Sequence, residues 1–254
     1  LRADGLGIAF CLIALLIGAV VFAYSTAYLG SGPQLSFYLV MTTFTLSMVG
    51  LVLADDLVLL FICWELTSLA SFFLVARSGH AGEAASMRTL LMTYIGGLAL
   101  ITAVGLMIAR TGTTNLTAVL ADPVWRTDPA FTGAVAVLVL IAGFSKSAQF
   151  PFHVWLPDAM AAITPVSAYL HAAAVVKAGI FLLMRFSPAF HATPVWNVCL
   201  IGFGLFTAAL GAWFALQQTD LKRMLGYSSM SQIGYIVTAI ALMSHLGWVT
   251  AFYL

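Results

Sequence analysis

The stretch GFSKSAQFPFHVWLPD, residues 143–158, contains a lysine, a histidine, an aspartate and two prolines within an otherwise apolar segment. That segment runs from about residue 131 to 160, and as one straight helix it would measure about 45 Å, more than the roughly 30 Å hydrocarbon core of a bilayer. Pro151 lacks the N–H that a continuous helix needs, and it disfavours helical geometry at Phe150. The sequence therefore predicts a helix that breaks near residues 149–151.

The composition of the chain is that of a membrane protein. Of its 254 residues, 62% are hydrophobic and 7% are charged, against about 45–50% and about 25% in soluble domains. The formal net charge of +1 does not indicate binding to nucleic acid. Backbone groups in lipid must be satisfied internally, and period-two alternation is absent, so helices are favoured over a barrel. We therefore expect residues 1–254 to form a single all-α, polytopic transmembrane domain.

Apolar runs long enough to cross a membrane recur along the whole chain. The connectors on one side of the membrane carry four basic residues, and the connectors on the other side also carry four. The positive-inside rule therefore does not decide the orientation. The chain does not begin with Met, and its last apolar run is short, so we expect a fragment of a longer protein. The predicted spans are 6–29, 35–54, 57–76, 88–109, 131–160, 166–186, 195–216 and 224–243, and another begins near Trp248.

Among the ionisable residues that fall within these spans, three stand out: Glu65, Lys146 and Lys177. A charged group at membrane depth costs at least about 2.5–3.5 kcal/mol on insertion scales. Glu65 and Lys177 are predicted near the middle of their spans, too deep to snorkel comfortably. One interpretation is a set of structural ion pairs that set helix register. The other is a proton relay, in which burial disfavours the charged forms while mutual attraction favours them.

The predicted break has polar groups on both sides. Lys146 precedes it, and we expect its ammonium to be held by freed carbonyls, by water and by Ser145, Ser147 and Gln149. His153 follows the break, where it could pass a proton in either direction or donate one hydrogen bond to the broken backbone. Trp155 and Asp158 are expected to mark the approach to the membrane interface.

Two further basic residues follow the break. His171 precedes Lys177 by six residues, which on one helix separates them by about 120° and about 9 Å, so a water could help to bridge them. Lys222 lies in a connector, where charges are ordinarily solvated and Asp220 can cap the next helix.

The remaining residues of note indicate packing. Gly96, Gly97 and Gly105 are expected to let helices approach closely. The sequence contains no phosphate-binding loop, haem-attachment motif or metal-ligand spacing, so no cofactor or metal site is predicted. Three cysteines in apolar runs are expected to be small buried hydrophobic residues: Cys11, Cys63 and Cys199.

Three stretches together resemble a known family. They are LLFICWELTSLASFFL, FSKSAQFPFHVWLPDAMAAITPVSAYLHAAAVVKAGIFLLMRF and LQQTDLKRMLGYSSMSQIGY. This pattern closely resembles the proton-translocating antiporter family shared by respiratory complex I and the multi-subunit cation/proton antiporters. Within this family, the lysine at position 177 and the motif FPFHVWLPDAM make the chain most similar to the large A subunits of Mrp sodium/proton antiporters.

The resemblance implies an architecture of two inverted five-helix repeats, each with a broken helix. Residues 35–186 would form the first repeat, and residues 195–254 would begin the second. The connector from Arg77 to Arg88 would face the cytoplasm. By the same resemblance, the proton-relay residues would be the pair Glu65 and Lys146, the connecting residues His171 and Lys177, and Lys222 at the head of a later helix.

We therefore expect a proton-translocating subunit of a multi-subunit sodium, or similar monovalent cation, antiporter in a bacterial cytoplasmic membrane. Its partners would be other membrane subunits. An enzyme is not expected, since no nucleophile is paired at readable spacing with His153 or His171. One alternative is a proton-pumping subunit of a redox complex such as complex I or a membrane-bound hydrogenase. The other is a non-conducting scaffold subunit.

Overall fold

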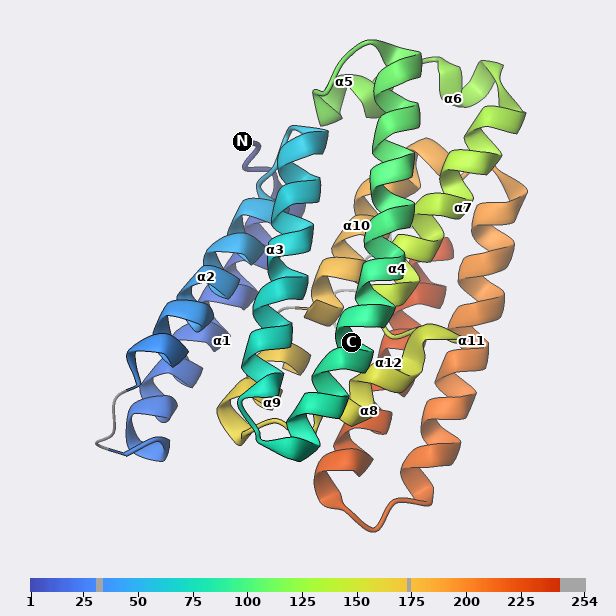
Figure 1. Cartoon of the computed structure of the whole chain (residues 1–254). Coiled ribbons are helices and arrows are strands. Elements are labelled where there is room, and N and C mark those ends of the chain that lie inside the picture. The colour runs from blue at the N-terminus through green and yellow to red at the C-terminus, as the bar shows by residue number, and fades with distance from the viewer. Residues whose placement is uncertain (31–33, 173–174, 243–254) are drawn as a thin grey trace.

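The computed structural model describes residues 1–30, 34–172 and 175–242. Within these ranges the regular structure is helical, and the long helices run side by side in a bundle (Figure 1). The elements are α1 (Gly5–Tyr28), α2 (Leu35–Val52), α3 (Leu57–Ala76), α4 (His80–Thr111), α5 (Leu116–Ala121), α6 (Val124–Thr127), α7 (Pro129–Lys146), the 3-10 helix η1 (Phe152–Val154), α8 (Trp155–Ala159), α9 (Thr164–Ala172), α10 (Val175–Phe190), α11 (Pro194–Leu216) and α12 (Leu221–Ala241).

Side-chain caps explain where several helices begin. A polar side chain immediately before the first turn accepts from backbone N–H groups that have no partner within the helix. The capping residues are Asp4 for α1, Asp56 for α3, Asn115 for α5, Asp128 for α7 and Asp220 for α12.

The predicted spans agree with the helices to within a few residues, with three differences. In the described part of the chain, seven helical segments are long and apolar enough to cross a membrane. The span predicted over 224–243 corresponds to α12, which is a long helix but is not one of those seven, because serines and Gln232 make it more polar. Helix α4 begins eight residues before the predicted 88–109. The apolar run from Trp248 lies outside the described residues.

The break predicted in the 131–160 segment is confirmed. Helix α7 ends at Lys146, the backbone turns through Ala148 with a φ of 51°, and the short elements η1 and α8 follow. Backbone hydrogen bonds from Gln149 to the Phe144 carbonyl and from Phe152 to the Gln149 carbonyl close the turn. The helix therefore ends about three residues before the position expected from Pro151.

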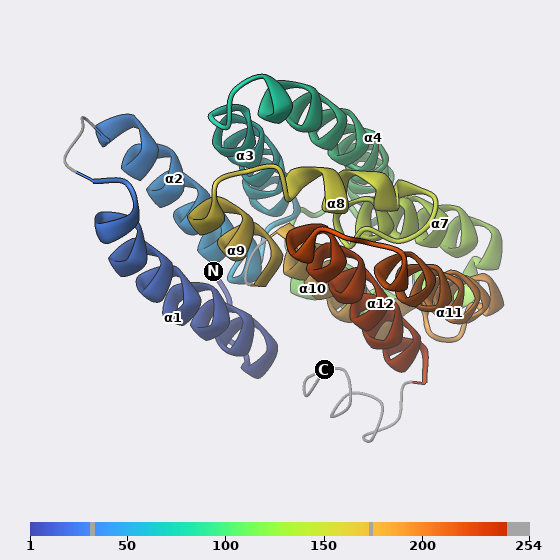
Figure 2. The same ribbon diagram turned by 90° about the horizontal axis from the view of Figure 1, so that it is seen from below.

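Helix α10 lies between the two sides of the bundle. Viewed from below, α1 and α2 form one side and α11 and α12 the opposite side, with α8, α9 and α10 between them and α3 and α4 along a third side (Figure 2). Nearly every described side chain of α10 is buried. Gly179 permits close contact with α7, since a Cβ there would lie 2.6 Å from the Gly143 carbonyl oxygen. This contact positions α10 against the end of α7, where the break begins.

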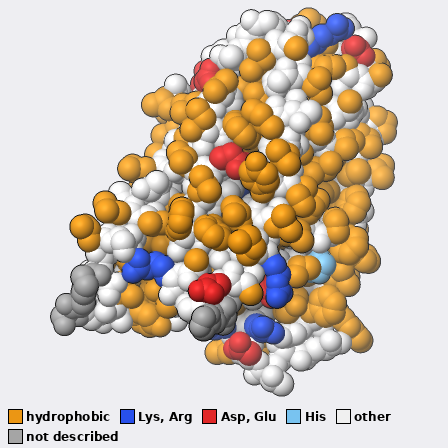
Figure 3. Space-filling view, viewed as in Figure 1, with side chains coloured by type: hydrophobic (Ala, Val, Ile, Leu, Met, Phe, Trp, Pro, Cys, Tyr) orange, Lys and Arg blue, Asp and Glu red, His pale blue; other side chains and the backbone are white. Residues whose placement is uncertain are grey.

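The outer face of the bundle is hydrophobic. Figure 3 shows apolar atoms covering the sides, with most charged atoms gathered at the two ends. Exposed Leu, Ile, Val and Phe side chains lie on α1, α2, α3, α4 and α11. Of the three cysteines, Cys63 is buried as expected, whereas Cys11 and Cys199 are only partly buried.

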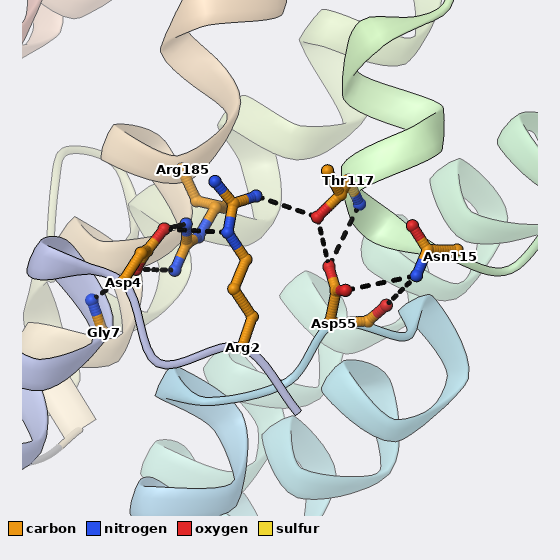
Figure 4. A network of polar contacts seen from close by, with 7 residues as sticks. All are labelled: Arg2, Asp4, Gly7, Asp55, Asn115, Thr117 and Arg185. Carbon is orange, nitrogen blue, oxygen red and sulfur yellow. Dashed lines mark hydrogen bonds and ion pairs between the residues drawn. The ribbon is translucent and has the colours of Figure 1, made fainter.

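A polar network joins four segments at one end of the bundle (Figure 4). Arg185, on α10, donates two hydrogen bonds to Asp4, and its side chain is only 5% exposed. Arg2 also pairs with Asp4, at 3.0 Å, and its Nη1 donates to Thr117 of α5. Asp55, in the α2–α3 connector, accepts from the Thr117 backbone N–H and hydroxyl. The network ties the start of α1 and helix α10 to α5 and to the α2–α3 connector.

Candidate functional site

Lys146 is the fully buried charged residue at the break. Its Nζ donates to the Trp64 carbonyl oxygen at 2.6 Å and to the Thr67 hydroxyl, both on α3. The ammonium also lies 4.2 Å from the centroid of the Trp64 ring, where the ring face favours a cation. The side chain thus crosses from the end of α7 to the middle of α3, and its hydrogen-bond acceptors are neutral oxygens.

The partners expected for Lys146 from its own segment were wrong. Ser145 donates to the Ala142 carbonyl, Ser147 to the Gly143 carbonyl, and Gln149 to the Ser147 carbonyl. Serines in helices commonly bond to the preceding turn in this way, because those carbonyls are the nearest acceptors. The local polar residues therefore satisfy the broken backbone, and Lys146 finds its acceptors on another helix.

Glu65 lies next to Trp64 on α3 and is half-buried. Its Oε1 atom is buried and has no hydrogen-bond partner in the described part of the chain. Lys146 acts on Glu65 electrostatically, although no ion pair joins the two side chains in the structure. A cavity of about 310 Å³ adjoins Glu65 and is lined also by Leu69 of α3 and by Met87, Leu90, Leu91 and Tyr94 of α4. Figure 3 shows acidic atoms in the middle of the hydrophobic face over α3 and α4.

The freed backbone groups at the break are held by side chains from elsewhere. Trp155 donates its Nε1–H to the Ser145 carbonyl at 2.8 Å. The Phe150 N–H donates to the Thr207 hydroxyl of α11 at 3.0 Å. Trp155 is 0% exposed, so its indole packs inside the protein, and its expected place near the membrane interface stays a prediction. Because the break exposes carbonyl and N–H groups inside protein, an indole and a hydroxyl contribute more there than at the surface.

The half-helix α8 is also tied to α4. The Arg88 Nη1 lies 2.7 Å from Asp158 Oδ2, and the carboxylate side chain is 21% exposed. Asp158 is thus paired across the bundle end and serves to hold α8 in place, in addition to the interfacial position expected for it.

His171 and Lys222 line one cavity of about 370 Å³ between α9 and α12, together with Thr164, Ser167 and Ser229. Both ring nitrogens of His171 are buried without hydrogen-bond partners among the described residues. Lys222 donates from Nζ to the Ala162 carbonyl at 2.7 Å, so its side chain is directed at the α8–α9 connector. Asp220 does cap α12, as expected, through the Lys222 backbone N–H.

The other two predicted site residues lie apart from these groups. The His153 ring stacks on Phe150, with centroids 5.8 Å apart. No polar contact joins His153 to the other candidate residues in the described ranges. Lys177 is half-buried on α10 and forms no hydrogen bond or ion pair within them. The expected spacing of His171 and Lys177 on one helix includes residues 173–174, which lie outside the described residues.

Three residues at this site were missed by reasoning from the sequence. Trp64 and Thr67 supply the acceptors for Lys146, and Thr207 holds the break. Thr67 follows Trp64 by one helical turn, so the two share a face, and this periodicity was the available signal. Which of several similar faces meets Lys146 depends on how the helices pack.

Comparison with known proteins supports the resemblance inferred from the motifs. Residues 54–254 match the family described as NADH:quinone oxidoreductase/Mrp antiporter, transmembrane region. The chain is 44% identical over 246 residues to antiporter subunit mnhA2 of Staphylococcus aureus strain MRSA252, a match that covers 95% of this chain and 31% of that protein. The mnhA2 protein of strain MSSA476 matches similarly, with 44% identity over 248 residues. The chain thus spans about a third of the length of the curated relatives it matches.

Two solved structures share the fold. A chain in the structure of the Mrp complex from Dietzia sp. DQ12-45-1b is 56% identical, with a TM-score of 0.95, and the match covers 98% of this chain and 28% of that one. A chain of the membrane-bound sulfane sulfur reductase, an archaeal respiratory membrane complex, is 26% identical, with a TM-score of 0.83, over 92% of this chain and 49% of that one. The all-α antiporter-like fold predicted from the sequence is therefore confirmed.

Proposed function

Because this chain belongs to the NADH:quinone oxidoreductase/Mrp antiporter family, we propose that it forms a proton-translocating region in a subunit of a multi-subunit monovalent cation/proton antiporter. It is a multi-pass protein of the cell membrane, as predicted. Its partners would be other membrane subunits, and its transported ions would be protons and sodium or a similar cation. The relative of known structure from Dietzia was solved as an Mrp complex, which supports this assignment.

The observation that best supports the proposal is the environment of Lys146. The lysine is 0% exposed, it lies at the end of a broken helix, and its acceptors are a carbonyl and a hydroxyl. A buried charge is costly unless it is paired, so a lysine held by neutral oxygens beside Glu65 is sensitive to the charge of that neighbour. Loading or unloading a proton at Glu65 would therefore change the affinity of Lys146 for its own proton.

The route would continue through the centre of the bundle. Neither ring nitrogen of His171 has a hydrogen-bond partner among the described residues, and the ring lies beside the cavity that it shares with Lys222. Lys177, on the central helix α10, would connect this cavity to Lys146 through water. His153 would be a side branch, since its ring stacks on Phe150. About 100 mV of membrane potential contributes roughly 2.3 kcal/mol per elementary charge, which is enough to switch such sites.

The test measures cation-driven proton movement by the assembled complex in inverted membrane vesicles. We expect Glu65→Gln and Lys146→Ala each to abolish transport, because each removes one member of the coupled pair. Arg126→Gln, an exposed arginine on α6, is the control and should transport normally. Assembly of each complex is checked by native gel electrophoresis. Wild-type transport in both Glu65→Gln and Lys146→Ala would rule out the proposal and favour a scaffold role.

A second candidate is a redox-driven ion pump. The likeness to the archaeal respiratory membrane complex favours it, because the same fold occurs there. The subunits that purify with this chain distinguish the two. Iron–sulfur clusters in the purified complex, with transport that requires an electron donor, would favour the redox pump. Transport driven by an ion gradient alone would favour the antiporter.

A further inference from the structure

Two adjacent glycines on α4 lie at the point where α3 and α7 approach that helix. A Cβ at Gly97 would lie 2.0 Å from Glu65 Oε1 and 2.9 Å from its Cδ. A Cβ at Gly96 would lie 1.7 Å from the Ser145 hydroxyl oxygen. Both glycines are buried. Real Cβ atoms do not approach other atoms so closely, so each glycine makes room for one specific polar side chain.

Close helix packing by itself does not explain Gly97. At Gly179 and Gly211, where helices also pack closely, a new Cβ would meet backbone atoms of the facing helix. At Gly97 the three nearest atoms all belong to the carboxylate of Glu65. Its Oε1 atom is the one buried without a hydrogen-bond partner among the described residues, so no donor fixes its position there. The shape of the α4 surface is what limits where this carboxylate can lie.

We propose that Gly97 is a positioning residue for proton transfer, because its missing side chain lets the Glu65 carboxylate lie against α4 at the position from which it acts on Lys146. This inference rests on the proposed function. An alanine would displace the carboxylate, and the cavity of about 310 Å³ beside Glu65 offers space for the displaced group. Displacements of about 1 Å at a reacting group can change rates by about 100-fold.

Gly105, on the same helix, provides the first control. The expectation that Gly105, like Gly96 and Gly97, lets helices approach closely was wrong, because a Cβ at Gly105 would meet nothing within 4 Å. Alanine favours a helix over glycine at either position. Gly105→Ala should therefore leave transport unchanged and should not lower the melting temperature of the complex. Gly97→Ala should lower transport by roughly 10- to 100-fold and should lower the melting temperature.

Gly96 provides the second control, because it is equally buried and meets a different side chain. Shortening Glu65 to Asp withdraws the carboxylate by about 1.5 Å, one bond length. We expect Glu65→Asp to relieve the loss of melting temperature caused by Gly97→Ala, and not that caused by Gly96→Ala. A Cβ at Gly96 would also lie 2.7 Å from the Ser145 Cβ, so Ser145→Gly, which removes the whole side chain, should show the opposite pattern.

Transport rates and melting temperatures together separate this inference from the proposed function. Melting temperatures report the contact between Gly97 and Glu65 whether or not Glu65 transfers protons. An equal loss of melting temperature from Gly97→Ala with Glu or Asp at position 65 would overturn the contact. If Glu65→Asp relieves the loss of melting temperature caused by Gly97→Ala, but Gly97→Ala alone transports normally, the positioning role would be overturned. Normal transport by Glu65→Gln would instead overturn the proposed function, while the melting-temperature result would stand.

Discussion

At the scale of the residue, the cost of burying charge explains the site. Lys146 is held by the Trp64 carbonyl, the Trp64 ring and the Thr67 hydroxyl, all within one turn of α3. Glu65 occupies the same turn, so the carboxylate and the acceptors move together if α3 moves. The importance of Glu65 and Lys146 could be predicted from the sequence, because ionisable residues in apolar spans are rare. The acceptors could not, because serine and threonine occur on many other helix faces of this chain.

Thr67→Val tests the hydrogen bonding of Lys146. Valine keeps the shape of threonine and removes the hydroxyl that accepts from Nζ. A hydrogen bond to a charged group contributes about 1.5–3 kcal/mol, so the free energy of unfolding of the complex should fall by about that amount. Thermal unfolding measures the change. Thr102→Val is the matched control, since the Thr102 hydroxyl is exposed and, in the part of the chain that the structure describes, bonds only to the Leu98 carbonyl of its own helix. Equal effects of the two variants would contradict the prediction.

At the scale of the element, the broken helix combines a local and a long-range cause. Pro151 accounts for the existence of the break, and the length of the 131–160 segment makes it necessary. The position of the break, directly after Lys146, depends on partners from other elements. Trp155 returns to bond the Ser145 carbonyl, and Thr207 of α11 accepts from the Phe150 N–H. These partners could not be inferred from residues 143–158 alone.

Thr207→Val tests whether α11 holds the break. The variant leaves the Phe150 N–H without its acceptor, and an unsatisfied polar group inside a protein costs about 1–3 kcal/mol. We expect lower thermal stability and faster hydrogen exchange at the break. Thr207→Ser keeps the hydroxyl and should show little of either effect. If the serine and valine variants lose the same stability, packing by the methyl group is the cause and the hydrogen bond is not.

At the scale of the whole molecule, charge gathers at the two ends, and the sides are apolar (Figure 3). The network of Arg2, Asp4 and Arg185 closes one end by joining the first helix to the central helix α10 (Figure 4). The division into two inverted repeats, with residues 35–186 as the first, stays a prediction. So does the cytoplasmic orientation of the Arg77–Arg88 connector. Labelling single cysteines in that connector from either side of the membrane would determine the orientation.

The Asp4–Arg185 pair makes a prediction about pH. The hydrogen bonds from Arg185 lower the pKa of Asp4 from its usual 3.8 to about 2. A lowered pKa means that the carboxylate stabilises the fold above about pH 4, and that this stability is lost as the pH falls toward 2. Asp4→Asn should therefore reduce the free energy of unfolding by about 2 kcal/mol at pH 7.

Melting temperatures of the wild-type and Asp4→Asn complexes, measured between pH 7 and pH 3, check this prediction. The difference between them should stay constant down to about pH 4 and then shrink. A difference that disappears by pH 6 would show that another group is responsible. Asp122→Asn, between α5 and α6 at the same end of the bundle, makes the same change in net charge and is the control (Figure 1).

The sequence by itself determined the class of the molecule, most of the long helices within a few residues, the break before Pro151 and the residues whose burial is costly. These follow from the length and polarity of local segments, because a bilayer imposes the same limits on every span. Only the tertiary structure decided which atoms meet: that Lys146 bonds to α3, that Trp155 is buried beneath the break, and that Gly97 makes room for Glu65 while Gly105 faces open space. The reason is that contacts between residues 30 to 80 positions apart depend on the rotation and spacing of whole helices, which many apolar sequences permit equally well.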